Sequence, residues 1–348
     1  MRKMEIVVVG PGLIGKTHIQ LIQENPLCHL AALVAPDKPK HHEYARSLSA
    51  PLHYSLQECL KSRHVDGVII ASPNLFHAEQ AIECIEAGVA VLVEKPFTDN
   101  LANGHRVLAL AEQRQAKVLV GHHRAHSPIL AHARSAIKAG RLGQLVSVMG
   151  SAQFHKPDHY FEAGPWRKEP GGGPILINLI HEIGNLRSLC GEIHAVQAVA
   201  SSKIRGFKVE DTVGINLLFK NGVIGTFLLS DTAATAKSWE QTSGENPSYP
   251  RSADDDCYTI CGTMGSLSVP TMRLMHYSNG TTPSWWTPFS QETLDIERRN
   301  PLQCQLEHFL DVIAGKTHPL VSARDGFRNL QIVEAVRQST QNNQLIEV

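Results

Sequence analysis

Residues 5–15 read EIVVVGPGLIG, and this stretch decides the fold of the first part of the chain. Its β-branched run, which ends at Val9, is typical of a strand that is buried on both faces of a parallel sheet. The glycines that follow allow a tight turn, and the helix opened by this turn offers free N–H groups to phosphate charge. Because a strand precedes the turn directly, the stretch predicts a dinucleotide site. The predicted contacts are Gly10, Gly12, Leu13, Ile14 and Gly15.

Apolar runs of strand length alternate with helical patterns up to residue 122. Strands are predicted at 5–9, 30–34, 65–71, 89–93 and 118–120, and helices at 15–23, 78–86 and 101–115. Alternation of this kind gives a doubly wound parallel sheet with helices on both faces. Residues 1–122 are therefore predicted to form an α/β dinucleotide-binding domain.

Longer alternating β segments follow residue 123. They lie at 145–154, 194–201, 211–219, 223–229, 258–261 and 265–269, and Asn221-Gly222 predicts a hairpin between two of them. We expect an α+β domain over 123–348 with an open, mainly antiparallel sheet. Helices are predicted at 127–139, 176–189, 302–314 and 326–341, and the last two can pack back on the first domain. The polar stretch 231–256 is predicted to be a long loop.

Composition narrows the classes of function. The 348 residues carry 33 basic and 33 acidic side chains and no long basic stripe, so no nucleic-acid partner is expected. No segment has the length of a membrane span. Seven scattered cysteines indicate free thiols in a reducing compartment, so we expect a cytoplasmic protein. Cys257 and Cys261 lack a second pair at zinc spacing, and no metal site is expected.

The ribose end of the cofactor site leaves two cofactors open. An acidic residue is expected at the end of the second strand, about twenty residues after the glycine turn, but Ala35 stands there. Asp37 can reach a ribose from two positions later. Lys38 or Lys40 can instead meet a 2′-phosphate, or both can be solvated loop charges. The cofactor is thus NAD or NADP, with NAD slightly favoured.

Two residues have the chemistry of hydride-transfer sites. Lys95, in Glu94-Lys95-Pro96, follows a buried strand, where ligands of doubly wound folds bind, and can hydrogen-bond a substrate oxygen. It can equally form a surface ion pair with Glu94. His181 follows the glycine loop 171–173, and histidine is suited to taking a hydroxyl proton near neutral pH. Asn178 lies three residues earlier, on the same helix face.

Together these motifs resemble the glucose–fructose oxidoreductase, inositol dehydrogenase and rhizopine-catabolism protein family (Gfo/Idh/MocA). The resemblance extends over nearly the whole chain. The matching motifs are Gly10–Gly15, Ser72-Pro73-Asn74 with His77, Glu94-Lys95-Pro96, Gly121-His122-His123-Arg124 with Pro128, Gly171–His181, Gln305–Ala314, Pro319-Leu320-Val321 and Asp325-Gly326.

Membership implies an N-terminal Rossmann domain, a nicotinamide cofactor, and a sugar, polyol or related cyclic alcohol as substrate. It also implies a homodimer or homotetramer packed through the open sheet. Lys95 and His181 match the family's catalytic residues. Two positions depart from the family, because Ile177 and Gly184 stand where many relatives carry aspartate. Beyond the glycine turn, the expected cofactor contacts are Asp37, Ser72, Pro73, Asn74, His77, Glu94, Lys95, Pro96 and Arg124.

The expected substrate site lies between the nicotinamide and the second domain. Lys95 stabilises charge on the reacting oxygen, and His181 takes the proton. Aromatic and basic side chains between the first long strand and the glycine loop can line the site, or belong to a mobile surface loop. The substrate contacts are expected among Lys95, His123, Arg124, His155, Trp166, Arg167, Asn178 and His181, with His159 and Tyr160 nearby.

Three further interpretations concern the second domain and the reaction class. Trp239 and Glu240 can cover the site or meet another subunit, and 254–256 is a solvated acidic run. Proteins of this fold also include NAD-dependent glycoside hydrolases that use transient oxidation. Others are nucleotide-sensing regulators without catalytic residues, which the presence of Lys95 and His181 disfavours.

Overall fold

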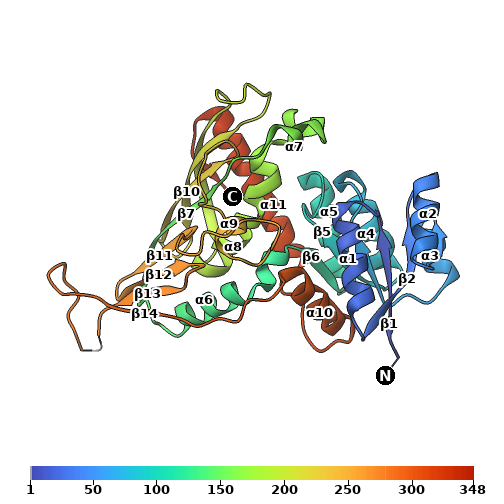
Figure 1. Cartoon of the computed structure of the whole chain (residues 1–348), viewed down its shortest axis with the longest axis horizontal. Coiled ribbons are helices and arrows are strands. Elements are labelled where there is room, and N and C mark those ends of the chain that lie inside the picture. Colours follow the sequence, from blue (N-terminus) through green and yellow to red (C-terminus); the bar gives the residue numbers. More distant parts are fainter. Residues whose placement is uncertain (1, 279) are drawn as a thin grey trace. The chain divides into compact units, whose positions relative to one another are not determined.

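The computed structural model describes residues 2–278 and 280–348, which form two compact units (Figure 1). Unit 1 holds the chain up to His126 together with Pro301–Leu330. Unit 2 holds Ser127–Asn300 and Gln331–Val348. The border between 122 and 123 stays a prediction of the sequence, whereas the first crossing between the compact units follows His126.

Unit 1 is built on a six-stranded parallel sheet with the order β3-β2-β1-β4-β5-β6. The order changes direction between β1 and β4, and ligands of doubly wound sheets bind outside the strand ends at such a point. The strands are β1 (Met4–Val9), β2 (Cys28–Val34), β3 (Leu52–His53), β4 (Gly67–Ile70), β5 (Ala90–Glu94) and β6 (Val118–Gly121).

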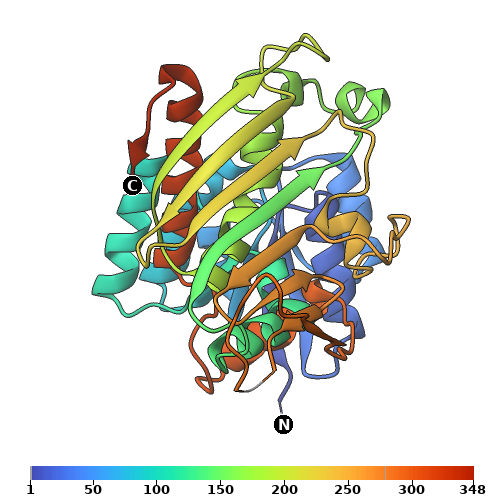
Figure 2. The same cartoon turned by 90° about the vertical axis from the view of Figure 1, so that its left-hand side faces the viewer.

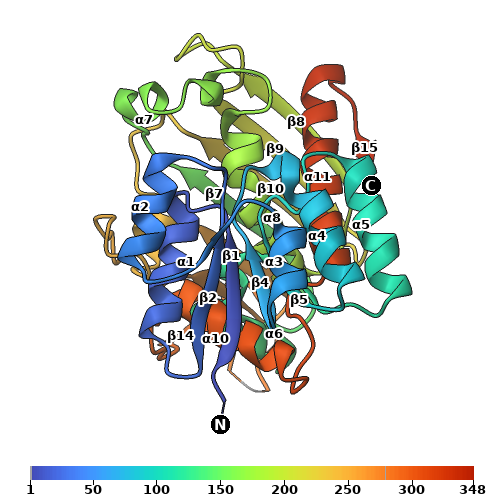
Figure 3. The ribbon, with the colours of Figure 1, turned by 90° about the vertical axis from the view of Figure 1, so that its right-hand side faces the viewer.

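Helices cover both faces of this sheet, which confirms the predicted doubly wound fold (Figure 3). One face packs against α3, α4 and α5 through Cys59, Ala81 and Val107. The other packs against α1, α2 and α10 through Ile22, Ala45 and Phe309. The helices are α1 (Leu13–Glu24), α2 (Pro39–Ser47), α3 (Leu56–Ser62), α4 (His77–Glu86), α5 (Leu101–Gln113) and α10 (Pro301–Ile313), with 3₁₀ turns η1 (Asn74–Phe76) and η2 (His123–His126).

Unit 2 contains a nine-stranded sheet with the order β14-β13-β12-β11-β7-β10-β9-β8-β15. Most neighbours are antiparallel, as predicted, but β10 runs parallel to β7, so the sheet is mixed. The strands are β7 (Leu145–Gln153), β8 (Ile193–Ser201), β9 (Thr212–Phe219), β10 (Ile224–Ser230), β11 (Tyr258–Gly262), β12 (Gly265–Val269), β13 (Arg273–His276), β14 (Ser290–Thr293) and β15 (Ile346–Glu347).

One face of this sheet carries the core of unit 2. Ile129 of α6, Ile183 of α8 and Val333 of α11 pack against it, whereas none of the helices that the structure describes lies in front of β7–β10 on the opposite face (Figure 2). The hairpin turn at Asn221-Gly222 joins β9 to β10 as predicted. The helices and turns are α6 (Pro128–Lys138), α7 (Asp158–Glu162), η3 (Pro165–Lys168), η4 (Ile175–Leu179), α8 (Ile180–Cys190), α9 (Trp239–Thr242) and α11 (Ala323–Asn342), whose first part belongs to unit 1.

The segment 231–256 is more ordered than the predicted loop. It contains the short helix α9, and Trp239 is only 3% exposed because its ring packs against Tyr258 and its Nε1 donates to Glu245 Oε2 at 3.0 Å. The prediction that Trp239 covers a site or meets another subunit is therefore wrong. The acidic run is also partly paired, since Lys237 contacts Asp255 at 2.6 Å and Arg273 contacts Asp256 at 2.7 Å.

Candidate functional site: a nucleotide edge in unit 1 and a polar cluster in unit 2

The glycine turn lies at the carboxyl end of β1, and two of its three glycines are required on steric grounds. Gly10 adopts φ +87°, and a Cβ there would lie 2.7 Å from the backbone of Ser72. A Cβ on Gly15 would lie 2.0 Å from the carbonyl oxygen of Gly10. A Cβ on Gly12, in contrast, would meet nothing within 4 Å. The backbone at the start of α1 thus faces open space, which fits a pyrophosphate at a helix N-terminus.

The ribose end of the site is exposed. Ala35 is buried at the end of β2, and Asp37, Lys38 and Lys40 follow it on the surface. The Asp37 carboxylate already has a partner in His42, whose Nε2 lies 2.6 Å from Oδ1. Asp37 is therefore held close to the end of β2 while most of its side chain stays accessible.

His77 joins two loops that the sequence assigns to cofactor binding. Its Nδ1 lies 2.9 Å from the carbonyl oxygen of Pro96, and its Nε2 lies 2.9 Å from that of Ser72. The ring is 2% exposed. This side chain thus connects the loops after β4 and β5. The role of Pro73 and Asn74 as cofactor contacts stays a prediction.

Lys95 follows β5 at the same edge of the sheet as the glycine turn, because β1, β4 and β5 are parallel neighbours. The preceding Glu94 is buried and not at the surface. Its Oε1 lies 2.8 Å from Nε2 of His18 on α1, and its Oε2 accepts from the backbone N–H of Lys95 at 3.2 Å. The carboxylate therefore connects the helix of the glycine turn to the lysine.

His123 and Arg124 follow β6 at the next position along this edge. Burial lowers the pKa of His123 well below its usual value, and the positive charges of Arg124 and Lys95 lower it further. The imidazole is therefore neutral at neutral pH. Arg124 is itself buried, and its predicted contacts with cofactor and substrate stay predictions.

His181 stands in the first turn of α8 and is buried. The preceding residues 175–179 form a π-helical turn, η4, a feature often found at functional sites. Glu210 holds the start of this turn, since its Oε1 accepts from the N–H of Ile175 at 2.9 Å. A Cβ on Gly173 would lie 2.6 Å from the same oxygen, so the glycine loop is needed for this approach.

Lys156 is a buried residue that the sequence analysis did not select. Its Nζ donates to Oδ1 of Asn178 at 2.7 Å and lies 3.8 Å from Oδ2 of Asp231. Arg205 binds the same carboxylate, with Nε 2.8 Å from Oδ1. No local sequence pattern predicts this cluster. Its members stand at positions 156, 178, 205 and 231, and only the fold brings them together.

The aromatic and basic residues before the glycine loop form a partly ordered surface. The guanidinium of Arg167 lies 3.9 Å from the ring centroid of Tyr160, and Trp166 is 56% exposed. His155 is exposed and its Nδ1 lies 3.1 Å from the carbonyl oxygen of Thr232. Residues of this segment thus contact one another and, through His155, the residue Thr232 that follows β10.

Comparison with known proteins bears on both units. Residues 4–122 match the model of an oxidoreductase family with an NAD-binding Rossmann fold. Residues 134–348 match the model of the C-terminal alpha/beta domain of the same family. The chain belongs to the Gfo/Idh/MocA oxidoreductase family.

Curated Gfo/Idh/MocA relatives match most of the chain. The 1,5-anhydro-D-fructose reductase of Ensifer adhaerens is 27% identical over 84% of this chain and 83% of its own length. The rhizopine catabolism protein MocA of Rhizobium meliloti is 25% identical over 96% and 94%. The WlbA dehydrogenase of Bordetella pertussis, solved with NADH and UDP-GlcNAcA, superposes with a TM-score of 0.79 at 22% identity and covers 100% of this chain and 99% of its own.

Two residues of this Gfo/Idh/MocA chain, His18 and Lys156, were not selected from its sequence. His18 had a detectable signal, because it lies on α1 in one buried stripe with Gly15, Ile19 and Ile22. Lys156 had no such signal in the sequence.

None of the helices formed by residues 2–278 and 280–348 combines the length and the hydropathy that a bilayer crossing requires.

Proposed function

We propose that this chain transfers a hydride between NAD(P) and a hydroxyl or carbonyl carbon of a sugar, polyol or related cyclic alcohol. The observation that supports this most is the position of Lys95 at the carboxyl end of β5, on the sheet edge that also holds the glycine turn. A bound nicotinamide supplies the hydride acceptor in the oxidation and the donor in the reduction.

The chain's own residues supply binding and proton transfer. Lys95 donates a hydrogen bond to the reacting oxygen and stabilises the negative charge that develops there. His181 takes the hydroxyl proton during oxidation and returns it during reduction. His123, which is neutral because burial and neighbouring positive charges lower its pKa, adds a hydrogen-bonding group beside Lys95 without a further charge.

For the cofactor we propose NAD. The exposed carboxylate of Asp37 can accept hydrogen bonds from ribose hydroxyls and would repel a 2′-phosphate. Lys38 and Lys40 are the opposing feature, because their side chains favour a phosphate at the same loop. Separate calorimetric titrations with both oxidised cofactors measure this preference.

The proposed reaction is tested with a panel of sugars and polyols, monitored by the absorbance of reduced nicotinamide. Loss of the proton acceptor in His181→Ala should lower kcat by roughly 10²–10⁴-fold on the substrate found, with cofactor affinity unchanged. His132→Ala, an exposed histidine of α6, is the matched control and should keep its activity. Near-normal turnover by His181→Ala contradicts the assignment.

The same assay separates this function from the alternatives. Reduction of added NAD(P) in proportion to substrate consumed identifies a dehydrogenase. Cleavage of a glycoside without net reduction of added cofactor identifies a hydrolase that uses transient oxidation. Cofactor binding without either reaction on any compound identifies a sensing protein.

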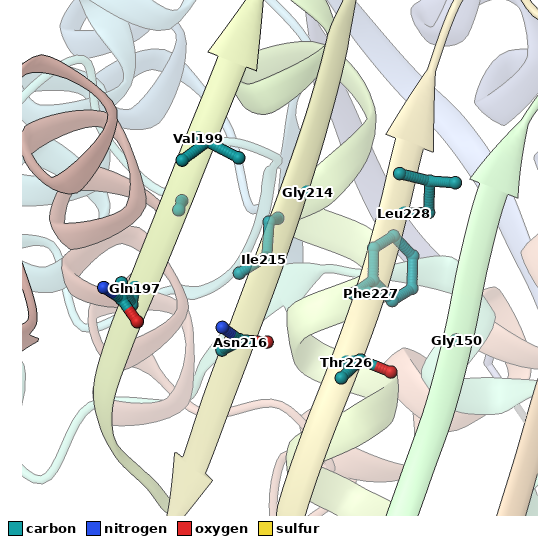
Figure 4. A pocket seen from close by; sticks show the side chains of 10 residues that line it. Gly150, Gln197, Val199, Gly214, Ile215, Asn216, Thr226, Phe227 and Leu228 are labelled. Carbon is teal, nitrogen blue, oxygen red and sulfur yellow. The ribbon is translucent and has the colours of Figure 1, made fainter. Parts of the chain in front are cut away.

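We also propose that the open face of the unit 2 sheet pairs with a second copy of the chain. Apolar side chains from three strands project from this face, with Val199 63%, Ile224 60% and Met149 57% exposed. A hollow of about 460 Å³ lies on this face, where Gly214 leaves room beside Val199 and Leu228 (Figure 4). An apolar, largely flat surface of this kind marks a site of protein association.

A further inference from the structure

The proposed function leaves Lys156 without a role, although its position is tightly determined. Its backbone N–H donates to the carbonyl oxygen of Asp231 at 2.9 Å, and its own carbonyl oxygen accepts from Arg205 at 2.8 Å. The side chain is 11% exposed. Burying a lysine is costly unless its charge finds partners.

The short contact of the ammonium is with an amide, not with a carboxylate. Nζ lies 2.7 Å from Oδ1 of Asn178 but 3.8 Å from Asp231, whose charge is shared with Arg205. The rings of Phe154 and Tyr160 lie 5.4 Å and 5.0 Å from Nζ and add attraction without accepting a conventional hydrogen bond. The ammonium of Lys156 thus makes its short contact with a neutral group, and the Asp231 carboxylate oxygen lies beyond hydrogen-bond distance.

This contact determines how the Asn178 amide is oriented. An ammonium group has only donors, so it must face the amide oxygen. The Nδ2 group therefore points away from Lys156. Within residues 2–278 and 280–348 this NH₂ group makes no hydrogen bond, and Asn178 is only partly buried. Its two N–H bonds are available to a ligand.

Asn178 is also close in the chain to the proposed proton acceptor. It lies in the π-helical turn η4, three residues before His181 in the first turn of α8. A ligand that reaches His181 is therefore expected near the Asn178 amide. An aspartate there would act differently from this amide, because a carboxylate accepts hydrogen bonds and repels anions.

We propose that Lys156 fixes the Asn178 amide with its N–H groups toward the substrate and that this pair selects a sugar acid over the neutral polyol of the same skeleton. The proposal rests on the proposed function and names its substrate class. A carboxylate oxygen only accepts hydrogen bonds, so it matches the oriented NH₂ group, and its negative charge is attracted by the ammonium that holds the amide. A hydroxyl matches the amide but gains nothing from the charge.

Burial, basic groups and acidic groups all act on the Lys156 ammonium. Burial lowers the pKa of Lys156 to about 8, and the guanidinium groups of Arg205 and Arg167 act in the same direction. The carboxylates of Asp231 and Glu240 oppose this shift without cancelling it. The carboxylate of Glu210 also interacts with Lys156, and a ligand carboxylate at the Asn178 amide would add a negative charge beside the ammonium that holds this amide.

Kinetics with D-gluconate and D-glucitol, which differ only at one terminal carbon, test the selection. Lys156→Met keeps the apolar stem and removes the donors. We expect the ratio of kcat/KM for gluconate over glucitol to fall about tenfold or more in Lys156→Met and in Asn178→Asp. Lys156→Arg keeps donors and charge and should retain most of the preference. An equal change on both compounds, or a wild-type preference for glucitol, overturns the proposal.

A spectroscopic measurement makes the test independent of turnover. In protein labelled at its asparagine side chains, the NH₂ signals of Asn178 are those missing from Asn178→Asp. Gluconate or glucuronate should shift these signals in the wild type, and glucitol should shift them less. Such a shift in a protein that reduces neither cofactor supports this proposal while refuting the proposed function. Signals that neither acid moves refute the proposal, whatever the activity.

Discussion

The nucleotide edge of unit 1 and the polar cluster of unit 2 are built by different means. The nucleotide edge consists of backbone, where Gly10 and Gly15 allow chain segments to approach more closely than any side chain permits. The polar cluster consists of long charged side chains, with Lys156, Arg205 and Asp231 buried around one amide. The first is steric and local in sequence, whereas the second is electrostatic and assembled from distant segments.

This difference indicates which substitutions each region can tolerate. Gly10 and Gly15 have no substitute, because a Cβ at either position would overlap the backbone. Members of a charged cluster can be exchanged in pairs, because what must be conserved is the balance of charge and hydrogen bonds. The nucleotide edge is thus suited to a function common to a family, and the cluster to one that differs between its members.

The largest effect is expected from Gly15→Ala. The added Cβ would lie 2.0 Å from the Gly10 carbonyl oxygen, so the turn must rebuild, and we expect a loss of about 4 kcal/mol or more in the free energy of unfolding. Gly12→Ala is the matched control, because its Cβ meets nothing within 4 Å. It should unfold like the wild type in urea but bind cofactor more weakly. Equal stabilities for the two variants would mean that the steric account of the turn is wrong.

An intermediate effect is expected when the cluster loses one partner. Arg205→Met leaves the buried Asp231 carboxylate without its closest cation, which should lower the free energy of unfolding by about 3 kcal/mol. The double variant Arg205→Met/Asp231→Asn should recover part of this loss. Lys208→Met, which removes an exposed pair with Glu169, should cost less than about 1 kcal/mol. Urea unfolding measures all three, and no recovery in the double variant would show that the balance of charge is not what matters.

The smallest effect on stability is expected on the open sheet face. Ile224→Arg changes an exposed side chain and should alter the free energy of unfolding by less than about 0.5 kcal/mol. It should nevertheless dissociate the proposed dimer, which light scattering detects as a halved mass. Ile204→Arg, equally apolar and exposed but outside the sheet strands, is the control. The proposed pairing through the open sheet face is contradicted if the wild-type protein is monomeric at all concentrations. It is also contradicted if the Ile224→Arg variant stays assembled.

The contrast between backbone and side chains also explains what could be predicted. The strand before Gly10, the parallel sheet and the place of Lys95 at a strand end follow from short contiguous patterns, and the structure has them as predicted. The two-residue strand β3 and the polar helix α2 were missed, because neither has a periodic apolar pattern long enough to identify it.

The substrate side was predicted less completely for the same reason. His181 and Asn178 were selected from one motif, but Lys156, which orients Asn178, interacts across 22 positions of sequence. Trp239 was predicted to cover the site or to meet another subunit, because the polar residues around it gave no indication of a buried turn. Long-range partners of this kind become visible only when the fold is known.

The π-helical turn η4 has a consequence for how such sites diversify. A π turn contains one residue more than an α-helical turn, so it can be created or removed by inserting or deleting a single residue. Removing one residue between Ile175 and Leu179 would rotate the side chains before it by about 100° around the helix axis relative to His181. A different neighbour, such as Ile177, would then stand beside the histidine. A change of chain length by one residue can therefore exchange the group next to His181 while α8 itself stays unaltered.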